Sequence, residues 1–112
     1  MEKIKFNQHQ SVFKVGELPD KMYLLVKGSV GIFLPTNRSN DPNFIIQENE
    51  LFGEMGVIEN ELRMATARCL EDSEIISITK EEFNKRVNNS DVFVKGSLKA
   101  LSYRLRSVEK KM

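Results

Sequence analysis

Hydrophobic and polar residues alternate in short runs through the first 79 positions of the chain. Runs of this kind, rich in β-branched and aromatic residues and separated by Gly, Pro or Asn clusters, predict β-strands. We expect strands at residues 4–6, 11–15, 22–27, 29–34, 43–47, 64–70 and 74–79. The runs on either side of Gly28 predict a hairpin. Strands this short and frequent are typical of a β-sandwich or a jelly-roll barrel.

A helical period replaces the alternation at the end of the chain. Thr79 followed three residues later by Glu82 is a capping box, and it predicts a short helix that continues to Val87. Polar residues at 88–91 interrupt that helix and can cap a second one. Apolar residues then recur at heptad spacing, which predicts a stripe that packs on the barrel, on a partner copy or on both. The stripe consists of Val94, Leu98, Leu101, Leu105, Val108 and Met112.

Residues 51–67, LFGEMGVIENELRMATA, interrupt the strand pattern in the middle of the chain. A glycine before a short helical turn lets a ligand approach the backbone, and the first free N–H groups of the turn bind anions. Gly53 and Glu54 have this arrangement. A nearby arginine, Arg63, matches phosphate oxygens, and such a charge-assisted hydrogen bond contributes about 1.5–3 kcal/mol. The Glu54 carboxylate only accepts hydrogen bonds and suits a sugar hydroxyl.

These residues therefore predict a site for a nucleotide with one compact phosphate. An alternative remains open from the residues alone. In that alternative the segment is a surface turn in which Glu54 and Arg63 pair with each other or with solvent.

The composition argues against several other kinds of site. The chain has one histidine, His9, and one cysteine, Cys69. A metal site in a small barrel needs two or three histidines with a carboxylate, and a nucleophile needs a base, so we do not expect a metal or an enzyme. A single cysteine forms no internal disulfide and favours a reducing compartment, the cytoplasm. No apolar run approaches the ~20 residues of a membrane span.

Charge is distributed unevenly along the chain. Residues 92–112 contain six of the 17 basic residues and one acid, so the net charge of this tail is +5 while that of the remaining residues is −4. Segregation of this kind occurs in proteins that contact nucleic acids or membranes. A solvated helix face near an acidic body explains it more simply, and we expect no direct nucleic-acid contact.

The central segment resembles the phosphate-binding cassette of cyclic nucleotide-binding domains. That family includes the catabolite activator proteins, cyclic-nucleotide-gated channels and the regulatory subunits of cAMP-dependent protein kinase. The resemblance rests on Phe52-Gly53-Glu54-Met55-Gly56 and on Arg63-Met64-Ala65-Thr66-Ala67, with the kinase-like step of nine residues from Glu54 to Arg63. Residues 16–30, 78–83 and 101–105 resemble further parts of the family pattern, so the resemblance covers nearly the whole chain.

The resemblance implies a mainly β fold with C-terminal helices: a β jelly-roll barrel (double-stranded β-helix) with a short phosphate-cassette helix. Residues 1–112 would form a single domain, with the barrel at 4–79, the cassette at 51–67 and the helices at 80–112. It also implies a non-catalytic sensor that binds a 3′,5′-cyclic nucleotide and needs no cofactor. Arg63 would hold the phosphate and Glu54 the ribose 2′-hydroxyl. Gly53, Met55, Met64 and Ala65 would supply further ligand contacts, and Leu98, Leu101, Leu105 and Val108 would form the lid or dimer surface.

Met64 bears on the choice of nucleotide. Family members that prefer cGMP often have a hydroxyl residue directly after the phosphate arginine, whereas Met64 offers only apolar contact. We therefore expect cAMP to be favoured, with cGMP as the second possibility.

The sequence departs from the family pattern in three places. Asn49 stands where the family usually has glycine, and asparagine tolerates the same left-handed backbone. Few residues precede the first strand, and the chain stops at Met112 after the lid helix, so we expect neither the N-terminal helical segment nor an output domain. Two alternatives to a ligand sensor follow: a dimerising structural module not switched by ligand, or the sensory half of a transcription regulator. The partner would be a weakly bound second copy or a downstream effector domain.

Overall fold

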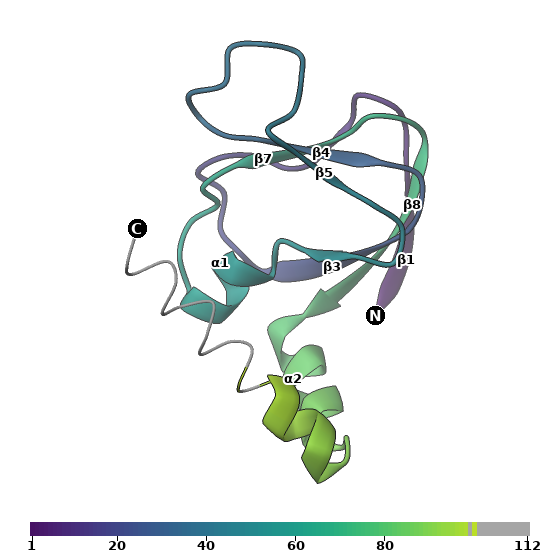
Figure 1. The fold of residues 1–112 in the computed structure, drawn as a ribbon, viewed down its shortest axis with the longest axis vertical. Helices are drawn as coiled ribbons and strands as arrows, with labels where there is room; N and C mark the ends of the chain where they lie inside the picture. Colours follow the sequence, from purple (N-terminus) through teal and green to yellow (C-terminus); the bar gives the residue numbers. More distant parts are fainter. Residues whose placement is uncertain (99, 101–112) are drawn as a thin grey trace. The chain divides into compact units, whose positions relative to one another are not determined.

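The computed structural model describes residues 1–98 and 100, which are arranged as shown in Figure 1. One compact unit comprises Met1–Lys80, and a second begins at Glu81. The strands are β1 (Glu2–Phe6), β2 (Ser11–Phe13), β3 (Lys21–Lys27), β4 (Val30–Phe33), β5 (Phe44–Ile46), β6 (Leu51–Phe52), β7 (Thr66–Cys69) and β8 (Ser73–Thr79), and the helices are α1 (Glu54–Glu59) and α2 (Lys80–Asn88). Residues 92–98 are also helical.

The strands form two antiparallel sheets with four strands each. Their orders are β1-β8-β3-β6 and β2-β7-β4-β5. Both sheets contribute side chains to one core, so they pack face to face. The predicted mainly β fold is confirmed, although the sheets do not close into a continuous barrel within the described residues.

The predicted hairpin around Gly28 is wrong. β3 pairs with β6 and β8, whereas β4 pairs with β5 and β7, so the chain passes from one sheet to the other at Gly28. Gly28 has φ 109°, and a Cβ there would lie 2.2 Å from Ser73 Oγ. The Ser29 N–H donates to Ser73 Oγ at 3.2 Å, and the Leu70 N–H donates to the Ser29 carbonyl at 2.8 Å. These contacts pack the crossing against the β7–β8 connection. The alternation of residues near Gly28 does not predict such long-range contacts.

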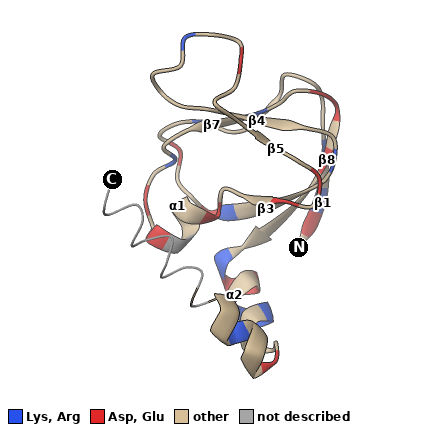
Figure 2. Ribbon diagram, in the orientation of Figure 1, with Lys and Arg blue, Asp and Glu red and all other residues tan. Residues whose placement is uncertain are grey.

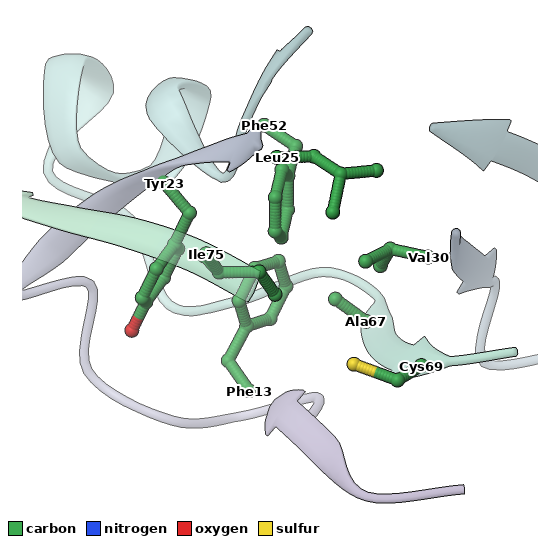
Figure 3. Packing of buried hydrophobic residues seen from close by; sticks show 8 residues of the cluster. All are labelled: Phe13, Tyr23, Leu25, Val30, Phe52, Ala67, Cys69 and Ile75. Carbon is green, nitrogen blue, oxygen red and sulfur yellow. The ribbon is translucent and has the colours of Figure 1, made fainter. Parts of the chain in front are cut away.

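Buried apolar side chains from both sheets fill the space between them. Figure 3 shows three aromatic rings at one end of this core and smaller side chains at the other. Ring centroids lie 5.9 Å apart for Phe13 and Tyr23 and 5.5 Å apart for Tyr23 and Phe52. Aromatic pairs at such distances contribute about 0.5–1.5 kcal/mol beyond the burial of their area. The core comprises Phe13, Tyr23, Leu25, Val30, Phe52, Ala67, Cys69 and Ile75.

The helical region begins where the capping box predicts it. α2 starts at Lys80, directly after Thr79, and ends at Asn88. The Val94 N–H donates to the Asp91 carboxylate at 2.9 Å, so the predicted cap of the second helix is confirmed. The later stripe residues Leu101, Leu105, Val108 and Met112 lie outside the described residues. No helix within residues 1–98 has the length and apolar character that a membrane span requires.

Candidate functional site

The central segment folds as a short helix entered and left through left-handed residues. α1 runs from Glu54 to Glu59. Gly53, which precedes it, has φ 74°, and Asn60, which caps its C-terminus, has φ 55°. The predicted helical turn after Gly53 is therefore confirmed. Asn49 has φ 71°, so the left-handed backbone expected at this position is confirmed as well.

Backbone hydrogen bonds fix Arg63 beside the turn that follows β2. The Arg63 N–H donates to the Glu17 carbonyl at 2.9 Å, and the Gly16 N–H donates to the Arg63 carbonyl at 2.8 Å. This pair of bonds ties the segment between α1 and β7 to a turn 47 positions earlier in the chain. Sequence spacing places Arg63 near the cassette, but the contact with this turn is tertiary.

The Arg63 guanidinium is buried, with 4% of the residue exposed. Its Nη1 donates to the Gly53 carbonyl at 2.6 Å, and its Nη2 donates to the Lys21 carbonyl. Its buried Nε–H has no hydrogen-bond acceptor among the described residues. No salt bridge joins Arg63 to Glu54 within residues 1–98, so the arrangement differs from the exposed ion pair of a surface turn.

Two aromatic rings of the core lie against the guanidinium. The Cζ atom of Arg63 lies 4.2 Å from the ring centroid of Phe13 and 5.9 Å from that of Tyr23. A cation over a ring face is attracted by about 2 kcal/mol when the pair is desolvated. The charged group therefore sits at the aromatic end of the core shown in Figure 3.

The glycines of the cassette make room for close neighbours, which at Gly53 include this guanidinium. A Cβ on Gly53 would lie 2.9 Å from Phe13 Cε2 and 3.1 Å from Arg63 Nη1. A Cβ on Gly56 would lie 3.0 Å from Pro19 Cβ and 3.4 Å from Arg63 Nη1. Sequence reasoning assigned Gly53 to the close approach of a ligand, and the structure adds a second reason, the close approach of Arg63.

Charges around Arg63 oppose the effect of its burial. Burial lowers the pKa of Arg63, while Tyr23, Asp20, Glu17 and Glu54 act to raise it. Burial also raises the pKa of Tyr23, an effect that the positive charge of Arg63 opposes. Figure 2 shows acidic residues on α1 and no Lys or Arg there. Because the ordinary pKa of arginine lies far above neutrality, the guanidinium stays charged.

The other predicted site residues are less closely assembled. Met55 and Ala65 are half-buried, and Met64 is 73% exposed. Leu98 belongs to the second unit, whereas Leu101, Leu105 and Val108 lie outside the described residues.

Sequence reasoning did not identify Phe13 or the Lys21 carbonyl as neighbours of Arg63. Alternation in residues 11–15 predicts that Phe13 faces the core. The alternation does not predict that the Arg63 guanidinium packs against the Phe13 ring at the aromatic end of the core.

A cavity of about 360 Å³ lies on the side of β4 and β7 that faces away from the core. Arg68 lies there with its Cζ 4.2 Å from the ring centroid of Phe33. The cavity is lined by Val15, Phe33, Leu34, Pro35, Asn37, Ser39, Thr66 and Arg68, and none of these is a predicted nucleotide contact. No cluster of three or more His, Cys, Asp or Glu in the described part of the chain is arranged to hold a metal ion.

Curated relatives of the chain are regulatory proteins. The chain is 28% identical over 112 residues to the "Anaerobic regulatory protein" of Bacillus subtilis, with 98% of this chain and 47% of that protein covered. It is 25% identical over 105 residues to the "Cyclic AMP receptor protein" of Thermus thermophilus, with 93% and 49% covered. The chain thus spans about half the length of the curated relatives it matches.

Solved structures of the EAL enzyme Bd1971 share the fold. The match to its half-site-occupied form covers 96% of this chain and 97% of the chain in that structure, with a TM-score of 0.83 and 33% identity. The forms described as bound to cAMP and cGMP have TM-scores of 0.72 and 0.74 at 34% and 33% identity, and the match covers 97% and 98% of this chain but 30% of each of theirs. The similarity therefore concerns a part of that enzyme.

The profile of the family described as "Cyclic nucleotide-binding domain" matches residues 3–90, which include both sheets and the cassette. Together with the mainly β jelly-roll architecture and the cassette geometry around Arg63, this match shows that the chain belongs to the cyclic nucleotide-binding domain family.

Proposed function

We propose that this chain is a non-catalytic sensor domain that binds a 3′,5′-cyclic nucleotide and relays its occupancy through the C-terminal helices. Residues 1–112 act as one domain, in which Met1–Lys80 holds the ligand and the helical residues after it transmit the signal. Family membership supports the ligand class. The described cAMP-bound and cGMP-bound forms of Bd1971 support a purine base.

The observation that carries the proposal is the state of the Arg63 side chain. Two of its nitrogens donate to the Gly53 and Lys21 carbonyls, and its buried Nε–H lacks an acceptor within the described residues. A buried donor without a partner is unfavourable by about 1–3 kcal/mol. A phosphate oxygen supplies the missing acceptor and is matched to the planar guanidinium.

The proposed roles of the remaining contacts follow from their chemistry. Glu54 opens α1 directly after Gly53, and its carboxylate accepts the hydrogen bond of the ribose 2′-hydroxyl. Gly53, Met55 and Ala65 offer backbone groups. Met64, which is 73% exposed, provides an apolar surface for the base and no hydroxyl for a guanine amino group, so cAMP is preferred to cGMP.

A structural module that does not respond to ligand is the main alternative. Such a module has no use for a buried, positively charged donor without an acceptor, which makes the sensor the better explanation. The regulatory relatives, of which the chain spans about half, support a proposal that the sensor serves a longer regulator with an effector domain. The same proposal locates the protein in the cytoplasm.

Two arginine variants provide a matched test by isothermal titration with cAMP, cGMP and 2′-deoxy-cAMP. Arg63→Lys keeps the charge but loses the guanidinium donors, and we expect about 10- to 150-fold weaker cAMP binding. Arg68→Lys changes the same residue type on the outer side of β7, and we expect unchanged binding. The wild-type chain should bind cAMP at micromolar concentration, and 2′-deoxy-cAMP more weakly, because it lacks the hydroxyl proposed for Glu54.

Three results would count against the proposal. Undetectable binding of both cyclic purine nucleotides by the folded wild-type chain at millimolar concentration would reject the sensor function. Equal losses in the two lysine variants would reject Arg63 as the phosphate residue. Tighter binding of cGMP than of cAMP would reverse the ligand preference based on Met64.

A further inference from the structure

We infer that Phe13 is a positioning residue for Arg63: its ring holds the guanidinium in the orientation that uses both Nη groups on carbonyls and leaves Nε–H for the ligand phosphate. This inference rests on the proposed function and extends it to a residue of the core. Phe13 lies in β2, 50 positions before Arg63, and is not among the predicted ligand contacts.

Besides the more distant Tyr23 ring, three contacts from separate parts of the chain constrain the guanidinium. Its Nη1 donates to the Gly53 carbonyl at 2.6 Å, and its Nη2 donates to the Lys21 carbonyl at the start of β3. The two hydrogen bonds limit rotation within the plane of the group. The Phe13 ring, 4.2 Å from Cζ, covers one face and limits tilting out of that plane.

The ring is itself fixed by the core. Phe13 is 9% exposed, and its centroid lies 5.9 Å from that of Tyr23 and 6.3 Å from that of Phe52. The backbone of Gly53 passes so close that a Cβ there would come within 2.9 Å of the ring. Since cores are closely packed, these neighbours restrict the movement of the ring. It can therefore act as a rigid support for the charged group.

Removal of the ring should be felt in ligand affinity. Without the support of Phe13, the guanidinium gains orientations in which its Nε–H no longer meets the phosphate, and it loses the attraction to the ring face. Interactions of a cation with a desolvated ring are large enough to change affinity by about tenfold. The same support also stabilises the ligand-free protein, so affinity and stability must be measured separately.

The chain contains a matched control for this test. Phe33 is 7% exposed and lies under the guanidinium of Arg68, with Cζ again 4.2 Å from the ring centroid. Phe13→Leu and Phe33→Leu therefore each remove a buried ring whose centroid lies 4.2 Å from an arginine Cζ. We expect Phe13→Leu to weaken cAMP binding about tenfold and Phe33→Leu to leave it unchanged, with thermal unfolding followed for both.

A second comparison separates positioning from a general structural effect. In an Arg63→Lys background there is no guanidinium for the ring to orient. If Phe13 acts through Arg63, the loss caused by Phe13→Leu should shrink to less than about twofold in that background. A loss of equal size with Arg63 and with Lys at position 63, or an equal loss in Phe33→Leu, would overturn the inference.

A measurement on the wild-type chain without ligand keeps the inference testable if the proposed function fails or if Phe13→Leu does not fold. Nuclear magnetic resonance of the arginine Nε–H groups should show a slowly exchanging Arg63 signal. That signal should be displaced by the ring current and show an Overhauser contact to the Phe13 ring protons. Absence of that contact rejects the positioning of Arg63 by Phe13. Presence of the contact without nucleotide binding rejects only the proposed ligand.

Discussion

At the residue scale, Gly16 and Gly53 separate two reasons for glycine in one fold. Both have left-handed backbones, with φ of 87° and 74°. A Cβ on Gly16 would meet nothing within 4 Å, whereas a Cβ on Gly53 would meet both Phe13 and Arg63. A residue with a Cβ would therefore have a strained backbone at both positions, but would meet a steric conflict only at Gly53.

Alanine substitution at the two positions should therefore have unequal effects. We expect Gly16→Ala to lower the free energy of unfolding by about 1–2 kcal/mol through backbone strain alone. Gly53→Ala should lower it by about a further 1–3 kcal/mol, because the new methyl group displaces a ring and a guanidinium. Urea denaturation measures both effects. Equal effects would show that Arg63 and Phe13 yield to a methyl group easily, which would contradict the close packing around Gly53.

At the element scale, the sequence predicts local structure better than it predicts the pairing of strands. The short strands, the helical turn after Gly53 and the helix start after Thr79 follow from patterns within a few residues of each other. The prediction of a hairpin around Gly28 is wrong because the chain crosses between the sheets there. The contacts that direct this crossing come from Ser73, 45 positions away. The same limit applies to the site, where the predicted Arg63 is held by Phe13 and by the carbonyl of Lys21.

The strand β7 provides a probe of how firmly the sheets are held together. It lies between β2 and β4 and carries Cys69, which is fully buried and is the only cysteine in the chain. Burial raises the pKa of the Cys69 thiol above its ordinary value. Native protein should therefore react very slowly with a thiol reagent at pH 8, at a rate set by the opening of β7.

The same labelling experiment also measures how bound ligand changes the opening of β7. Cyclic AMP at about 100 times its dissociation constant should slow the labelling about 100-fold if β7 opens only with loss of the site. Because the pKa of Cys69 is raised in the folded state, the contribution of this thiol to stability is present below its unfolded pKa and is lost as pH rises through the folded value.

Protein unfolded in urea supplies the intrinsic labelling rate of Cys69. Labelling of native protein at that rate would contradict the burial of Cys69.

At the scale of the whole molecule, the ligand contacts and the proposed relay belong to different units. Arg63, Phe13 and the cassette lie in Met1–Lys80, whereas α2 after Lys80 and the helical residues 92–98 belong to the second unit. In the second unit, none of the residues of α2 is buried, and Val92 and Phe93 are 83% and 85% exposed. Exposed apolar side chains next to each other, as in the described part of this unit, mark a contact surface.

We predict that the part of the heptad stripe from Leu101 to Met112, which lies outside the described residues, forms a weak homodimer or joins an effector domain. Basic residues beside the stripe, such as Arg106, Lys110 and Lys111, repel each other in a parallel pair, so the dimer should have a micromolar dissociation constant and should tighten as salt screens the charges. Sedimentation equilibrium at about 100 μM, with and without cAMP, measures this. Leu105→Asp places a charge in the stripe and should abolish the dimer. Ser107→Asp is the control, because Ser107 does not belong to the stripe, and it should preserve the dimer. A monomer in all conditions would contradict the dimer and leave the stripe to an effector domain, in which case ligand must act within a single copy of the chain.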